Sequence, residues 1–246
     1  MSITSMIHRA TIPSRRLSIM NDTKQNAKRA LTITTVLTLF VAGAEILIAY
    51  SNYKPGMNFL DITSYVTANK YIYYLILIIA NMVILPGAVL MYKQNGISLK
   101  DEIYSKQTLG KDIFTGFIAL AATEIIGLLT TLTYKGRTDL AYKDEKPDLE
   151  IIIIGFIALG LVSGIVKEIL FRGLAKRFCA PVMGETTAMI LFNIMFAMLD
   201  WHNYGYSFLI GLVWIWAYKK SGHLIAPMIA HGGSNIIAIL YLSIVS

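Results

Sequence analysis

The chain has 246 residues, of which 55% are hydrophobic and 15% are charged, and its formal net charge is +7. The mean hydropathy of +0.58 lies far above what a soluble domain needs to cover one core, so the composition excludes an ordinary soluble protein and predicts a membrane protein. The positive charge does not predict nucleic-acid binding, because the basic residues are spread over short segments between apolar runs.

Seven apolar runs follow one another along the chain. They cover residues 30–50, 71–92, 113–134, 151–166 with a helical continuation toward 178, 186–200, 206–218 and 224–245. A helix that spans a bilayer needs about 20 predominantly apolar residues, so five runs are long enough and those at 186–200 and 206–218 are short. We therefore expect an all-α, polytopic helical bundle with seven transmembrane helices, or eight if residues 60–66 re-enter the membrane.

The gaps between the runs are too short for a separate soluble domain, so one bundle accounts for the whole chain. We divide it into a basic N-terminal segment (1–29), N-terminal transmembrane helices (30–112) and an intramembrane core (113–246). The chain has a single cysteine, Cys179, so no intrachain disulfide is expected.

The distribution of Lys and Arg predicts the orientation, because cytoplasmic loops collect these residues. If the N-terminus is cytoplasmic, the inner segments carry 15 basic residues and the outer segments carry six, while Lys167 lies within a run. We expect a multi-pass protein of the cell membrane with a cytoplasmic N-terminus. The lipid bilayer is then its first partner.

Ionisable residues inside the runs are candidates for function, because burying a charge in a bilayer is costly unless the charge is paired or faces water. The candidates are Glu45, Glu124, Lys167, Glu168, Arg172, Asp200, His202 and His231, with Asn235 as a polar companion. Glu45 and Glu124 stand alone on their runs, so we interpret them as hydrogen-bonded within the bundle and without a chemical role. Gly160 and Gly164 form a small-xxx-small pair, for which we expect close helix packing.

The remaining candidates form three clusters on three runs. The first is Lys167-Glu168-Ile-Leu-Phe-Arg172, the second is Phe196-Ala-Met-Leu-Asp200, and the third is His231-Gly-Gly-Ser-Asn235. Glu168 and Arg172 are four residues apart, as are His231 and Asn235, so the members of each pair face the same way on a helix.

In order and spacing these clusters resemble the CAAX protease and bacteriocin-processing family of intramembrane proteins. That family carries Glu-Glu-x-x-x-Arg, then Phe-x-x-x-His, then His-x-x-x-Asn, and the resemblance covers residues 120–245. It implies a glutamate-dependent endopeptidase in which the first Glu and the second-motif His activate a water. His231 and Asn235 would then stabilise the oxyanion, a role that suits polarised hydrogen-bond donors.

Two positions depart from the family pattern, and both belong to the water-activating pair. Lys167 stands where the family has Glu, and Asp200 stands where it has His. We expect Glu168 to form a structural ion pair with Arg172. We also expect Lys167 to form an ion pair with Asp200 that closes the former water site. His202 lies about 200° around a helix from position 200, so it substitutes only if the helix unwinds, and we expect the helix to continue.

These departures predict a catalytically impaired family member that acts by binding a peptide or a membrane-protein partner, for example in bacteriocin immunity or as a regulatory scaffold. The alternative is an active intramembrane endopeptidase with rearranged residues. A proton-coupled carrier, suggested only by Glu45 and Glu124, is a third reading. We expect no metal or other cofactor, because Lys167 opposes cation binding and no His-x-x-x-His spacing is present.

Overall fold

The computed structural model describes residues 3–57, 70–133, 148–203 and 205–245, and within them the chain is helical with no strand. The first half contains α1 (Ile3–Ser51), α3 (Lys70–Gln94), α4 (Leu99–Ile103) and α5 (Leu109–Thr133). One uninterrupted helical rod follows, made of α7 (Leu149–Gly155), η2 (Phe156–Ser163), α8 (Gly164–Glu168), η3 (Ile169–Gly173), η4 (Ala175–Cys179) and α9 (Ala180–Met183). The chain closes with α10 (Glu185–Met198), η5 (Trp201–Asn203), α11 (Tyr206–Ser221) and α12 (Ile225–Val245).

Each of the seven apolar runs forms a helix, which confirms the all-α prediction. Four helices are long and apolar enough to cross a membrane: Met20–Ser51, Lys70–Gln94, Leu109–Thr130 and Leu149–Met183. Glu185–Met198 and Ile225–Tyr241 are shorter apolar helices. The protein is therefore multi-pass, while the count of seven or eight spans stays a prediction, since residues 60–66 lie outside the described part of the chain.

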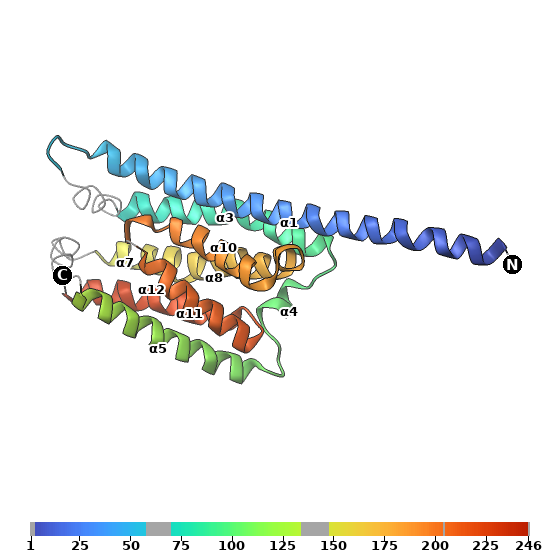
Figure 1. The fold of residues 1–246 in the computed structure, drawn as a ribbon. Coiled ribbons are helices and arrows are strands. Elements are labelled where there is room, and N and C mark those ends of the chain that lie inside the picture. The colour runs from blue at the N-terminus through green and yellow to red at the C-terminus, as the bar shows by residue number, and fades with distance from the viewer. Residues whose placement is uncertain (1–2, 58–69, 134–147, 204, 246) are drawn as a thin grey trace.

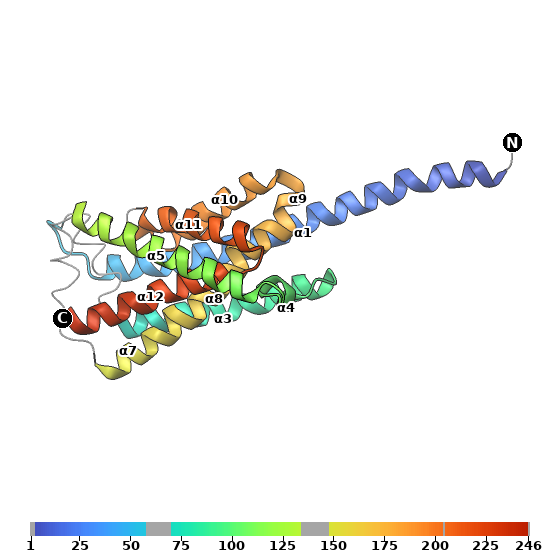
Figure 2. The ribbon, with the colours of Figure 1, turned by 90° about the horizontal axis from the view of Figure 1, so that it is seen from below.

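The helices lie roughly side by side, with the 149–183 rod among them (Figure 1). α1 packs against α3 and α10, and α12 packs against α5, α11 and the rod. The N-terminal part of α1 projects beyond the bundle in both views (Figures 1 and 2). We call the end of the bundle where α4 and the α11–α12 turn lie the α4 end.

A buried carboxylate, Glu102, joins several helices at the α4 end. Glu102 accepts hydrogen bonds from the Arg177 guanidinium and the Tyr218 hydroxyl, and its backbone oxygen accepts from the Leu224 N–H at 2.9 Å. The short α4 is thereby joined to the rod, to α11 and to the start of α12. Because a buried carboxylate needs such donors, these contacts hold α4, the rod, α11 and the start of α12 in fixed relative positions.

The rod approaches α12 closely at Gly160 and Gly164. A methyl group on Gly164 would lie 2.7 Å from the Gly232 Cα, and one on Gly160 would lie 2.7 Å from the Ile236 side chain. Such contacts leave no room for a Cβ, so the expected packing role of the small-xxx-small pair is confirmed. The rod also widens into π-helical turns before and after Glu168, a feature that is frequent at functional sites.

The end of α10 differs from the prediction that this helix continues past residue 200. The helix ends at Met198, and the N–H groups of Leu199 and Asp200 bond three residues back, at 3.1 and 3.2 Å. A short 3₁₀ turn over Trp201–Asn203 follows, and Gly205, with φ of 88°, allows the left-handed turn into α11. The tightened turn changes the direction in which His202 projects.

Candidate functional site

Glu168 connects the first motif to the third, because its side chain contacts both Arg172 and His231. Its Oε1 accepts from Arg172 Nη1 at 3.3 Å and lies 2.7 Å from His231 Nδ1. The three side chains are at most 3% exposed, and the other Glu168 oxygen has no hydrogen-bond partner among the described residues. The expected pair with Arg172 is therefore present, and His231 joins it from α12.

Arg172 contacts other groups in addition to Glu168. Its Nη2 donates to Asn193 Oδ1 at 3.2 Å and to the Gly211 carbonyl at 3.3 Å, and its guanidinium carbon lies 4.4 Å from the centre of the Phe196 ring. A Cβ on Gly211 would lie 2.0 Å from Asn193 Oδ1, so this glycine makes room for the network. Sequence reasoning missed Asn193, whose only local signal is an amide inside an apolar run.

Aromatic rings hold His231 in place. Its imidazole stacks on Trp214, with ring centres 4.1 Å apart and an interplanar angle of 17°, and it meets the edge of Phe196 at 5.5 Å. Trp214 in turn donates from Nε1 to Thr123 Oγ1 at 3.0 Å. Stacking and hydrogen bonding together restrict the orientation of the imidazole. Trp214 carries no motif signal, so the sequence did not single it out.

Asn235 lies one turn further along α12 and faces the rod, as the four-residue spacing predicts. Its Nδ2 donates to the Leu159 carbonyl at 2.9 Å. His231 Nδ1 is engaged with Glu168, so both third-motif side chains already have partners on the rod. The two residues thus connect α12 to the rod at two successive turns.

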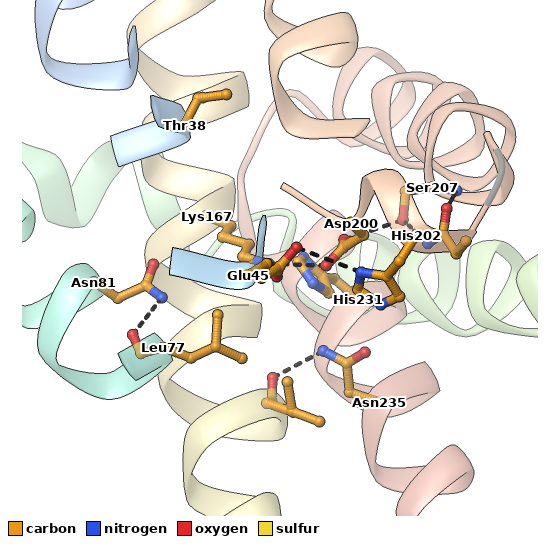
Figure 3. Close-up of polar contacts among 12 residues, drawn as sticks. Thr38, Glu45, Leu77, Asn81, Lys167, Asp200, His202, Ser207, His231 and Asn235 are labelled. Atoms are coloured by element: carbon orange, nitrogen blue, oxygen red, sulfur yellow. Dashed lines mark hydrogen bonds and ion pairs between the residues drawn. The ribbon is translucent and has the colours of Figure 1, made fainter. Parts of the chain in front are cut away.

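The two altered motif positions meet. Lys167 Nζ lies 3.8 Å from Asp200 Oδ1, and the exposed fractions of the two side chains are 4% and 19% (Figure 3). Lys167 Nζ also lies 5.7 Å from the centre of the Phe196 ring, and Asp200 Oδ2 accepts from Ser207 Oγ at 3.0 Å. The ion pair expected from the reversed polarity of these positions is present in the structure. We call Lys167, Glu168, Arg172, Asp200 and His231 the motif cluster.

One expectation from the sequence is wrong at the edge of this cluster: the helix does not continue past position 200, and this changes the surroundings of His202 and Glu45. Because α10 ends early, His202 reaches α1, and its Nδ1 lies 3.4 Å from Glu45 Oε2. The contact is at ion-pair distance, and by ordinary geometric criteria neither Glu45 oxygen has a hydrogen-bond partner among the described residues. Glu45 therefore has a partner within the bundle, His202, which the sequence did not identify.

Glu124, the other glutamate that stands alone on its run, lies on α5. Its Oε1 is buried and has no hydrogen-bond partner within the described part of the chain, so any hydrogen bond to this side chain stays a prediction. No three His, Cys, Asp or Glu side chains among the described residues are placed to hold a metal ion together.

Comparison with known proteins agrees with the motifs. Residues 149–237 match the family described as type II CAAX prenyl endopeptidase Rce1-like. No curated protein and no solved structure matches the chain. Because residues 149–237 contain all three motifs, the match confirms the resemblance read from their order and spacing.

Proposed function

We propose that this chain binds a peptide segment of a membrane partner beside the motif cluster, and that the family's water-activating positions do not hydrolyse it. One observation carries the proposal: Lys167 and Asp200 pair with each other at 3.8 Å, where the family has a glutamate and a histidine. A protonated lysine cannot accept a proton from water, and loss of a general base removes about 10²–10⁴-fold of rate.

The retained polar groups support binding. Glu168, Arg172 and His231 form a connected network that is almost completely buried. A buried network is costly unless every polar atom in it is hydrogen-bonded, and Glu168 Oε2 and Arg172 Nε have no partner among the described residues, so these atoms remain able to take one. The nearby side chains of Asp200 and His202 are 19% and 18% exposed, so a partner reaches the cluster from the α10–α11 turn.

The kind of molecule that could bind follows from the membrane environment of the motif cluster. A segment that enters the membrane presents backbone carbonyl and N–H groups, which need partners in a low-dielectric environment. A bacteriocin peptide, or a non-helical stretch of a membrane segment of an enzyme or sensor, has this chemistry. Immunity to a bacteriocin and regulation of a membrane partner are the two processes that we propose for the chain.

Photo-crosslinking in native membranes tests the proposal. A benzoylphenylalanine at Met198, the last residue of α10 and 47% exposed, should crosslink to a bound partner. Replacing His231 and Asn235 together by Ala should abolish the crosslink while the protein stays in the membrane. Ser243→Ala, a change near the far end of α12, is the matched control. An unchanged crosslink in the double variant at normal abundance would contradict the proposal.

A further inference from the structure

Glu45 is a buried carboxylate that accepts no hydrogen bond of ordinary geometry from the described residues. Its side chain is 1% exposed, and both of its oxygens lack a hydrogen-bond partner among the described residues. Burying a carboxyl group costs free energy unless the group is hydrogen-bonded or paired with an opposite charge. Because α1 lies outside the three motifs, nothing in the family pattern accounts for this residue.

His202 is brought to Glu45 by the early end of α10. Its Nδ1 lies 3.4 Å from Glu45 Oε2, and its ring meets the edges of Trp201 at 6.2 Å and Tyr73 at 6.5 Å. Two aromatic neighbours restrict the imidazole, while 18% of the side chain remains exposed. A carboxylate and a partly accessible imidazole thus face each other, as a base and its partner do in hydrolytic sites.

This pair adjoins the altered motif positions. Lys167 and Asp200 both interact electrostatically with Glu45 and with His202, and Lys167 also interacts with His231. Figure 3 shows Glu45, Lys167, Asp200, His202 and His231 gathered in one region between α1, the rod and α12. The acid and the imidazole that the two altered positions lack are therefore present a short distance away, on residues outside the motifs.

We infer that Glu45 and His202 replace the missing glutamate and histidine and activate a water against a carbonyl of the bound peptide. Glu45 takes a proton from the water as the water oxygen bonds to the carbonyl carbon. The Lys167 ammonium is the neighbouring positive charge that stabilises the resulting oxyanion. The C–N bond then breaks as the proton passes to the leaving nitrogen through His202, so one water is consumed and a carboxylate and an amine are formed.

The inference rests on the proposed peptide binding, and the experiment separates the two. The full-length protein is reconstituted in phosphatidylethanolamine and phosphatidylglycerol vesicles with a pool of synthetic single-span peptides, each carrying a photoreactive residue. Crosslinking reports binding. In water enriched in the heavy oxygen isotope, mass spectrometry of new carboxyl termini reports hydrolysis.

We expect the wild type to crosslink and to incorporate heavy oxygen. Glu45→Gln and His202→Gln should each lower incorporation by at least about a hundredfold with the crosslink retained. Glu124→Gln is the matched control, because it removes the charge of a membrane glutamate outside the motifs, whose Oε1 is also buried without a hydrogen-bond partner among the described residues. A melting temperature for each variant shows that it is folded, and either of the two test variants suffices if the other is unstable.

Three results would overturn the inference. Crosslinking without heavy-oxygen incorporation in the wild type would leave a binding protein that does not hydrolyse. Equal incorporation in wild type and in both variants would assign hydrolysis to other residues. No crosslink in the wild type would reject the proposed peptide binding itself, and the inference with it.

Discussion

Lys167 on the rod and Asp200 after α10 form an ion pair, with Nζ 3.8 Å from Oδ1. At these positions the family carries a glutamate and a histidine, so an acid and a base face each other with their places exchanged. The exchange keeps the local charge balanced, which a membrane interior requires. It also removes the proton acceptor from the position where the family activates water.

The coupling between these two residues is measurable. Lys167→Met and Asp200→Leu should each destabilise the protein more than the double change does, because each single change leaves one buried charge without its partner. We expect a coupling energy of about 1 kcal/mol or more from a double-mutant cycle on detergent-solubilised protein. The exposed pair Lys219–Glu185, at 3.6 Å, is the control, with a coupling of about 0.5 kcal/mol or less. Additive losses at positions 167 and 200 would mean that the two side chains do not meet.

Arg172 should be the most sensitive residue of the motif cluster. Arg172→Met leaves Glu168 without its cation and Asn193 without its donor, so we expect a loss of about 3–5 kcal/mol in the free energy of unfolding. Arg172→Lys should recover little, because a lysine cannot reproduce the bonds to Glu168, Asn193 and the Gly211 carbonyl at once. Chemical denaturation in mixed micelles measures both variants. A full rescue by lysine would show that charge alone matters there.

The contact between the rod and α12 predicts a steric effect at Gly164. Gly164→Ala places a methyl group 2.7 Å from the Gly232 backbone, so the helices must separate, at a cost of about 1–3 kcal/mol. Gly43→Ala on α1 is the matched control, since a Cβ there meets no atom within 4 Å and alanine favours the helix. Melting temperatures of the two variants should move in opposite directions. Equal shifts would contradict the close packing.

The orientation in the membrane is open to a direct test. In a Cys179→Ala background, Lys220→Cys should resist an impermeant thiol reagent in intact cells and react after permeabilisation. Lys54→Cys, at the other end of the bundle, should react in both conditions. The imbalance of 15 to six basic residues supports this orientation. Modification of position 220 before permeabilisation would reverse it.

The membrane class, the helical segments and the motif residues can all be predicted from the order of the amino acids. Hydropathy located seven helical segments, and the spacing of Glu168 with Arg172 and of His231 with Asn235 placed each pair on one helix face. The reversed charges at positions 167 and 200 also predicted their contact. These features are readable because apolar length, helical period and charge balance are local properties or follow from simple electrostatic pairing.

The residues that surround the motifs become visible only when the helices are packed together. Asn193 and Trp214 enter the cluster because α10 and α11 pack against the rod and α12, and Glu45 enters because α1 lies beside the turn that carries His202. That turn forms because the α10 backbone tightens after Met198, a boundary that the apolar pattern does not mark. Contacts between residues far apart in the chain depend on how whole helices pack, which no short stretch of sequence specifies.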